Sequence, residues 1–312
     1  PPVSMHDWGV FLSVVNMTIR KTDSSQNIES LLQATELFMF QAIGQTKAKS
    51  IAVVMRYHIE SGGARVRARL ALNAGLALNL EKKINVSLSA CCELIHNASL
   101  LHDDIQDGDE MRRGRMAAWL KFDINSAMCA GTLMLSAAYK AVSEVTVYSP
   151  QLIAHLHQRT SDLISGQIID FTSLASVIDV KTYLDMAKGK TGSLLALPLE
   201  LVMISANEPT ALPFAKIAGE SFAVAYQIAD DMSDLQADLA NSRTNIVGIL
   251  ENTGVTRPEA LTQAKLLAKE HLKFATEYAA KLPANSGAYF IKLCEALKEK
   301  FDAPQSSSIE NV

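Results

Sequence analysis

Two aspartate-rich segments with the same internal spacing constrain this chain more than any other feature of its sequence. Both follow the pattern DDxxD, and their aspartates are Asp103, Asp104, Asp107, Asp230, Asp231 and Asp234. On an α-helix, residues four apart lie above one another, so Asp103 and Asp107 point towards one place. Like charges at this spacing repel, so the arrangement requires a counter-charge. Without one, a single motif is more simply read as the solvated end of an acidic helix.

The second motif favours a metal site over that simpler reading. It follows an apolar run at residues 221–229 that is too hydrophobic for a solvated helix face. Aspartates at the end of a buried helix are costly unless they are paired or bind a metal. Mg²⁺ typically takes one or two carboxylates together with substrate phosphates. We therefore expect two facing carboxylate clusters, with Asp103, Asp107 and Asp230 on the metal and the other three aspartates as additional or outer ligands.

The rest of the chain predicts a helical bundle. Apolar residues recur at three- and four-residue intervals, and alternating strand patterns are scarce. The spacing predicts helices at about 28–46, 48–60, 65–80, 84–105, 116–144, 151–172, 180–205 (interrupted at Gly189 and Gly192), 212–238, 257–281 and 287–301. Several are apolar on more than one face, as central helices of a bundle are. We expect one all-α domain over residues 1–303, with a central apolar cavity, and a disordered polar tail at 304–312.

Composition argues against several other classes. The net charge of −4 over 312 residues, without a basic cluster, argues against a nucleic-acid-binding protein. No apolar run reaches the roughly 18 residues of a membrane span, and the start of the chain has no signal-peptide pattern. The four cysteines form no CxxC pair, and the histidines lack zinc-ligand spacing. These features favour a cytoplasmic location.

Five motifs together resemble the trans-polyprenyl diphosphate synthases, the family that includes farnesyl and geranylgeranyl diphosphate synthases. In chain order they are HNASLLHDD (96–104), RRG (112–114), GQIID (166–170), KTG (190–192) and QIADD (227–231). The resemblance implies an isoprenoid-synthase-type bundle, two to three Mg²⁺ ions and a homodimer. It also implies head-to-tail condensation of an allylic diphosphate with isopentenyl diphosphate, in which Mg²⁺ acts as a Lewis acid on the departing pyrophosphate.

Three residues are expected to act on the allylic substrate from broken or facing helices. Gly-Lys-Thr-Gly around Lys190 and Thr191 suggests a phosphate loop, but that motif needs a glycine where Leu184 stands. A broken helix that aims Lys190 at a diphosphate and Thr191 at a carbocation fits better. Gln227, one turn before Asp230, is expected to offer its amide dipole to the same cation.

The resemblance assigns four basic residues to the diphosphates. It places Arg112 on the allylic diphosphate, and Arg67, His96 and Arg113 on isopentenyl diphosphate. Guanidinium groups match diphosphate oxygens bidentately. Without the resemblance, the two adjacent arginines would be read as surface counter-charges, and a lone histidine as a satisfied core residue.

The chain departs from the family pattern around the acceptor. Ala64 stands where the family usually has lysine, Ala68 where it has proline, and Thr132 where it has aspartate. The Gly-Lys-bearing loop that normally follows the second motif is missing, and Arg243 is a candidate substitute for one basic group. Each lost charge-assisted contact costs about 1.5–3 kcal/mol, so the affinity for isopentenyl diphosphate is expected to fall about tenfold to a hundredfold or more.

Product length and reaction outcome rest on fewer residues. In the family, the positions occupied here by Ala98 and Ser99 line the floor of the chain pocket, so an open floor predicts a product of geranylgeranyl length or longer. Two alternatives remain open. The weakened acceptor site favours a terpene cyclase or an atypical prenyl-coupling enzyme on the same fold. A non-catalytic subunit of a heteromeric synthase is disfavoured, because both aspartate motifs are intact.

Overall fold

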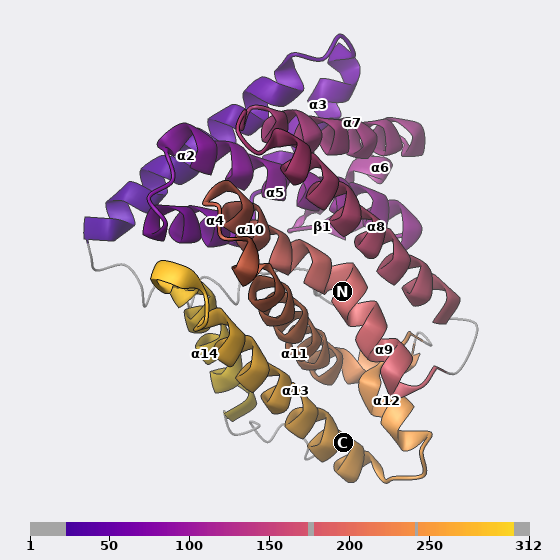
Figure 1. Cartoon of the computed structure of the whole chain (residues 1–312). Helices are drawn as coiled ribbons and strands as arrows, with labels where there is room; N and C mark the ends of the chain where they lie inside the picture. The colour runs from indigo at the N-terminus through magenta and orange to yellow at the C-terminus, as the bar shows by residue number, and fades with distance from the viewer. Residues whose placement is uncertain (1–22, 174–177, 241–242, 303–312) are drawn as a thin grey trace.

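Helices make up nearly all of the structure, a computed structural model that describes residues 23–173, 178–240 and 243–302. The helices are α2 (Asp23–Gly44), α3 (Lys49–Ile59), α4 (Val66–Ala77), α5 (Lys82–Gln106), α6 (Ala118–Lys121), α7 (Ile124–Ser143), α8 (Ser149–Ser173), α9 (Val180–Ala187), α10 (Ser193–Ser205), α11 (Leu212–Ala240), α12 (Ile246–Glu251), α13 (Arg257–Ala279) and α14 (Ala288–Asp302). The prediction of an all-α bundle is confirmed (Figure 1). The tail predicted to be disordered lies outside the described residues.

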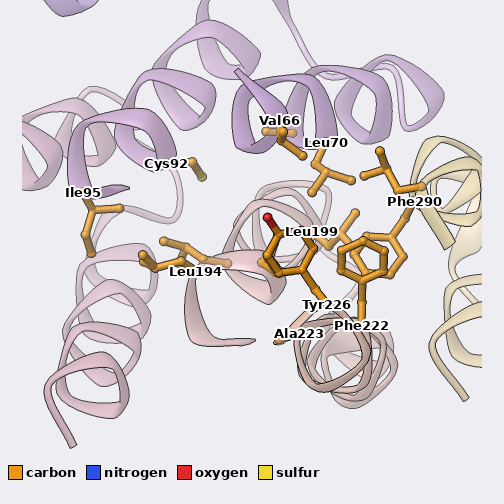
Figure 2. Packing of buried hydrophobic residues seen from close by; sticks show 14 of the residues in the cluster. Val66, Leu70, Cys92, Ile95, Leu194, Leu199, Phe222, Ala223, Tyr226 and Phe290 are labelled. Atoms are coloured by element: carbon orange, nitrogen blue, oxygen red, sulfur yellow. The ribbon is translucent and has the colours of Figure 1, made fainter. Parts of the chain in front are cut away.

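Helix α10 is the centre of the bundle. Every residue from Ser193 to Met203 is buried, and the helix packs against α4, α5, α8 and α11. Figure 2 shows its Leu199 beside Phe222 of α11, whose ring meets Phe290 of α14 edge-to-face at 5.4 Å between centroids. A helix that is apolar all round is expected at such a central place.

Three short features were not predicted. The helix expected over 116–144 is wrong at its start, because the chain breaks before Asp123, whose side chain accepts the Ser126 N–H at 2.8 Å and caps α7. The strands β1 (Met111–Arg112) and β2 (Arg115–Met116) form a hairpin just after the first motif. Its turn has positive φ at both central residues, 52° and 73°, as tight hairpin turns require. Helix α12 was also missed.

The helix break around Lys190 is a π-helical turn, η1 (Lys188–Gly192). Glycines explain how it fits between its neighbours. A Cβ on Gly189 would lie 2.9 Å from the Cα of Gly166 in α8, and a Cβ on Gly192 would lie 2.9 Å from the Cα of Glu220 in α11. Only glycine permits such close backbone approach. Gly166, Gly189 and Gly192 therefore allow the π-helical turn to pack directly against α8 and α11.

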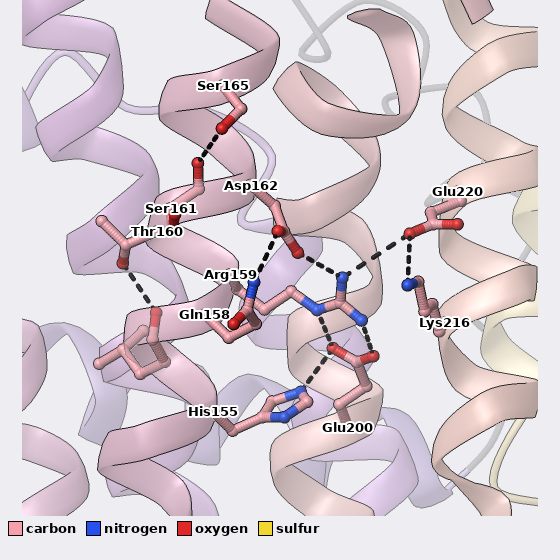
Figure 3. A network of polar contacts seen from close by, with 11 residues as sticks. His155, Gln158, Arg159, Thr160, Ser161, Asp162, Ser165, Glu200, Lys216 and Glu220 are labelled. Carbon is pink, nitrogen blue, oxygen red and sulfur yellow. Dashed lines mark hydrogen bonds and ion pairs between the residues drawn. The ribbon is translucent and has the colours of Figure 1, made fainter. Parts of the chain in front are cut away.

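A buried ionic network fastens the three helices around this break (Figure 3). Arg159 of α8 donates to Glu200 of α10, with Nε to Oε2 at 2.7 Å, and lies 3.7 Å from Glu220 of α11. His155 adds a second partner to Glu200 at 2.9 Å. Burial alone would lower the pKa of the Arg159 guanidinium, but these carboxylates raise it. Because its charges are paired, the network holds α8, α10 and α11 in register.

None of the helices in the described ranges is both long enough and apolar enough to cross a membrane.

Candidate functional site

The first aspartate motif lies at the C-terminal end of α5, where its members have different environments. Asp104 is buried and is paired with Arg112 of the hairpin, with Nε to Oδ1 at 2.6 Å. By contrast, neither Asp103 nor Asp107 accepts a hydrogen bond from any described side chain. Burial raises the pKa of Asp103 to about 7 although Lys190 opposes the shift, and burial also raises the pKa of Asp107. Two carboxylates are thus left short of positive charge.

Arg112 is held by carboxylates on two sides. Besides the pair with Asp104, its Nη2 lies 3.3 Å from Asp109. Arg112 therefore acts as a counter-charge, but in a buried position and mainly to Asp104, not at the surface. Its contact with an allylic diphosphate stays a prediction. Arg112 links the hairpin to α5 and so places the next residue, Arg113.

In the second motif, Asp231 is the anchored member. Its carboxylate accepts hydrogen bonds from the Tyr183 hydroxyl at 2.8 Å, the Gln227 amide at 2.9 Å and the Ile246 N–H at 2.8 Å. Burial raises the pKa of Asp231 to about 7, and these donors limit the shift. Asn245 fastens the same turn by donating to the Asp231 carbonyl at 2.7 Å. Sequence reasoning missed Tyr183 and Asn245, because only the fold brings them to the motif.

The other two members of the second motif retain excess negative charge. Burial, followed by the adjacent Asp231, raises the pKa of Asp230 well above its usual value, and Lys300 of α14 opposes this shift. Burial and then Asp238 raise the pKa of Asp234 to about 6.

Arg243 connects the two motifs electrostatically. Its charge opposes the pKa rise of Asp107 in the first motif and of Asp234 in the second. The charge of Arg243 therefore acts on both carboxylate clusters, which are more than a hundred residues apart in the chain. The sequence identified Arg243 as a substitute basic group, and this is the place that the structure gives it.

Lys190 acts electrostatically on the first motif, and its predicted contact with a diphosphate stays a prediction. Its Nζ donates to Asp170 of α8 at 2.5 Å. Burial alone would lower the pKa of Lys190, but Asp170, Asp103 and Asp107 together raise it. Asp170 belongs to a motif that carried the resemblance, yet its pairing was not foreseen. Thr191 follows within the π-helical turn, partly buried.

Four basic side chains from four elements (α4, α5, the hairpin and α3) form a second cluster, which we call the basic cluster: Arg67, His96, Arg113 and His58. Burial lowers the pKa of Arg67 to about 10. Burial, then Arg67 and Arg113, lower the pKa of His96 well below its usual value. Arg113 donates to the Gly62 carbonyl and approaches Ser61 Oγ at 3.4 Å. The structure thus brings together three residues predicted for isopentenyl diphosphate and adds one, His58, that was missed.

The segment at Ala64 and Arg65, where the sequence departs from the family pattern, is also unusual in its structure. Arg65 adopts a left-handed conformation with φ 51° and donates to Glu36 at 2.9 Å and to the Ile59 carbonyl at 3.0 Å. It is therefore tied to α2 and α3. The neighbouring Ala64 carries no charge that could act instead of Arg65.

The predicted chain-length positions lie on α5 between the acidic motif and the core. Ala98 is buried, and Ser99 is partly exposed with its hydroxyl donating to the His96 carbonyl at 2.8 Å. One turn earlier, Ile95 faces the core beside Leu194 of α10 (Figure 2). The role of these positions in product length stays a prediction.

The acidic side chains fit a cation that brings or finds further ligands. Across the described ranges, no three acidic, histidine or cysteine side chains converge into a closed metal cage. Asp103 and Asp230, which are half-buried, and Asp107, which is exposed, instead present electrostatically unbalanced carboxylates. Such open carboxylate sites suit Mg²⁺, which keeps waters and takes phosphate oxygens. The neighbouring basic cluster suits an anion.

Comparisons with known proteins point to one family. The family profile described as Polyprenyl synthetase matches residues 48–251. The (2E,6E)-farnesyl diphosphate synthase of Mycobacterium tuberculosis (strain CDC 1551) is 34% identical over 176 residues, which are 54% of this chain and 48% of the relative. The farnesyl diphosphate synthase of Haemophilus influenzae is 29% identical over 73% of this chain and 82% of its own length. The match with the first of these relatives thus spans about half of that protein.

Solved structures show the same fold. A decaprenyl diphosphate synthase from Rhodobacter capsulatus superposes with a TM-score of 0.79 at 22% identity, over 88% of this chain and 97% of that one. A geranylgeranyl pyrophosphate synthetase from Pyrococcus horikoshii gives a TM-score of 0.77 at 21% identity, over 88% and 97%.

Proposed function

Because the chain belongs to the polyprenyl synthetase family, we propose that it is a trans-prenyltransferase that condenses an allylic diphosphate with isopentenyl diphosphate. The observation that carries this proposal is that the charge of Arg243 acts on one carboxylate of each aspartate motif, and that of Lys190 on two carboxylates of the first. Paired carboxylate clusters around fixed cations suit a diphosphate held with metal ions. The named relatives are farnesyl, geranylgeranyl and nonaprenyl diphosphate synthases, which supports the same reaction class.

The six motif aspartates would divide into metal ligands and residues that fix the motifs in place. Asp103, Asp107 and Asp230 would hold Mg²⁺, which when bound supplies Lewis-acid stabilisation of the leaving pyrophosphate. Asp104 and Asp231 already have strong protein partners, which supports outer roles that fix the two motifs. Asp234 shares Arg243 and is suited to an additional, weaker contact.

The remaining residues would position the reacting groups. Lys190 and Arg112 would bind the allylic diphosphate, and the basic cluster the diphosphate of isopentenyl diphosphate. Thr191 and Gln227 would direct oxygen dipoles at the carbocation; the bond from Gln227 to Asp231 fixes the orientation of that amide. The allylic C–O bond breaks, the acceptor double bond forms the new C–C bond, and the departing pyrophosphate takes the released proton.

A second copy of the chain is proposed as the partner. Helices α7 and α8 carry apolar side chains that are about half exposed: Ile124, Met128, Ile164 and Ile168. Exposed apolar surface of this kind favours an interface. We expect a homodimer by sedimentation and a cytoplasmic location.

The decisive experiment is product analysis. Incubation with Mg²⁺, isopentenyl diphosphate and each allylic diphosphate in turn is expected to give a longer prenyl diphosphate, of geranylgeranyl length or beyond, by mass spectrometry. The second candidate is a cyclase or atypical coupling enzyme, which the tying of Arg65 to Glu36 favours. Release of pyrophosphate from the allylic substrate without consumption of isopentenyl diphosphate would select that candidate. Absence of both reactions would leave the non-catalytic subunit.

A further inference from the structure

Arg159 joins carboxylates from three helices through one guanidinium group. Its Nε and Nη2 bind Glu200 of α10, and its Nη1 lies 2.9 Å from Asp162 Oδ2 in α8 and 3.7 Å from Glu220 Oε1 in α11 (Figure 3). Arg159 and Glu200 are only 4% and 1% exposed. Charges buried this deeply are costly, and well-packed apolar side chains often stabilise a core as well. The pair is therefore a candidate for a role beyond stability.

Two of these carboxylate residues also form the backbone surface against which the π-helical turn η1 packs. The Asp162 carbonyl oxygen would lie 3.0 Å from a Cβ on Gly189, and the Glu220 Cα would lie 2.9 Å from a Cβ on Gly192. Arg159 Nη1 thus lies between the side chains of the two residues whose backbones enclose the turn. A shift of either backbone would displace η1, because glycine leaves no side chain between them.

The turn carries Lys190, which is proposed to bind the allylic diphosphate. Its Nζ donates to Asp170 of α8 at 2.5 Å. Asp170 lies two turns beyond Asp162 on the same helix. The backbone of Lys190 is therefore fixed by the packing of η1, and its ammonium is fixed by α8. Accurate placement matters here, since a misplacement of about 1 Å can lower a rate about a hundredfold.

We propose that Arg159 is a positioning residue that holds η1 in place through Asp162 and Glu220. Its pair with Glu200 anchors the guanidinium to α10, the helix that continues from the turn. Lys190 is thereby kept where it meets the leaving diphosphate. A planar guanidinium suits this role because it binds several carboxylates in fixed directions, which an ammonium does not. The identity of the diphosphate rests on the proposed function; the hold on η1 does not.

The test replaces both members of the buried pair, Arg159→Met together with Glu200→Met. Two methionines fill the space without leaving a buried charge unpaired, so the chain should stay folded, whereas Asp162 and Glu220 lose their shared cation. Hydrogen–deuterium exchange measures the backbone amides of residues 188–192, and calorimetry measures the affinity for pyrophosphate with Mg²⁺. We expect exchange at 188–192 to quicken about tenfold or more, and pyrophosphate to bind about 10- to 100-fold more weakly.

Steady-state kinetics separates the two substrates. The KM for the allylic diphosphate should rise and kcat should fall, each about tenfold, because both depend on the position of Lys190 under the proposed function. The KM for isopentenyl diphosphate, whose proposed site is the basic cluster, should change less than about twofold, as expected of sites that share no partner.

A matched control is Arg257→Met together with Glu251→Met. Arg257 also binds its carboxylate through two nitrogens, at 2.9 and 3.1 Å, but this pair joins the end of α12 to the start of α13. Its loss should leave exchange at 188–192 and the affinity for pyrophosphate unchanged.

Two results would overturn the proposal: unchanged exchange at 188–192 in the Arg159 and Glu200 double variant, or faster exchange spread equally over the whole bundle. Should that variant fail to fold, Arg159→Lys replaces it, because one ammonium keeps a charge beside Glu200 without the planar fork. Exchange at 188–192 that matches the natural protein would then contradict the proposal. If the turn loosens but the natural protein forms no longer prenyl diphosphate, the proposed function fails and the positioning role stands.

Discussion

Burial shifts pKa values in opposite directions on the acidic and basic sides of the site. On the acidic side, burial raises the pKa of Asp103 to about 7 and that of Asp230 still further. On the basic side, burial lowers the pKa of Arg67 to about 10 and makes His58 and His96 neutral near pH 7. If the proposed function holds, each side binds a ligand of opposite sign, a metal cation on the acidic side and a diphosphate on the basic side.

The two sides differ in how much of the family pattern they keep. All six motif aspartates are present, and two of them are fastened by protein partners, Asp104 by Arg112 and Asp231 by Tyr183. On the basic side, Ala64 stands where the family resemblance implies a lysine, and Arg65 is tied to Glu36. Under the proposed function, this difference means an intact centre for ionisation beside an altered acceptor site.

Removal of a carboxylate from the acidic side is expected to have the largest effect. Asp103→Ala and Asp230→Ala each delete a proposed metal ligand, and kcat should fall about 10³-fold or more, since metal stabilisation of a leaving group is worth several kcal/mol. Steady-state turnover at saturating substrates measures this. Asp185→Ala, on the exposed face of α9, is the control. Near-normal turnover in either motif variant would remove that residue from the metal site.

The pH dependence of stability tests whether the acidic side lacks a cation. The folded-state pKa of Asp103 and of Asp231 is raised to about 7, above the unfolded value of about 4. Such groups contribute stability that is complete below about pH 4 and is lost as pH rises through 7. The metal-free protein should therefore have a lower free energy of unfolding at pH 8 than at pH 5.

Mg²⁺ with inorganic pyrophosphate should offset this loss, since metal competes with protons for carboxylates. Urea unfolding at both pH values, with and without these ligands, measures the effect. Equal stabilisation at pH 5 and pH 8 would argue against binding at the motifs.

Restoration of a charge on the basic side should give a smaller, favourable change. Ala64→Lys adds the cation that the family pattern contains, and the KM for isopentenyl diphosphate should fall about threefold to tenfold, as one charge-assisted contact allows. The KM for the allylic substrate serves as the internal reference. An unchanged acceptor KM would mean that the diphosphate lies elsewhere than beside residue 64.

The smallest change in rate is expected at the floor of the chain pocket. Ala98 is buried on α5, and Ala98→Phe should shorten the product by about one isoprene unit or more, because the ring occupies space needed by the chain. Product masses measure this directly. Ser205→Phe, at the far end of α10, serves as the comparison for a general packing disturbance. An unchanged product distribution would place the floor at other residues.

Patterns local in the sequence predicted the main helices and the carboxylates they carry. The 3.6-residue period predicted α5 and α11 to within about two residues of their ends. The glycines around Lys190 predicted the helix break, which the structure shows as a π-helical turn. Pairs that depend on tertiary packing were not predictable in this way. Tyr183 reaches Asp231, and Asp170 reaches Lys190, only because α8, α9 and α11 meet around that turn.

The short elements were not predicted, for a different reason. The hairpin around Arg113 and the helix α12 are too brief for periodicity to register, and the cap at Asp123 competes with a continuous apolar pattern. His58 gave no signal at all, since a histidine at the end of a helix is ordinary until its neighbours are known.

We propose that the two aspartate motifs hold Mg²⁺ so that an allylic diphosphate can ionise. Pyrophosphate release from geranyl diphosphate with isopentenyl diphosphate, followed as Mg²⁺ is titrated into metal-free protein, tests this most directly. Release should rise with Mg²⁺, stop on chelation and be lost in both Asp103→Ala and Asp230→Ala. Release that persists without a divalent cation, or that survives either substitution, would contradict it.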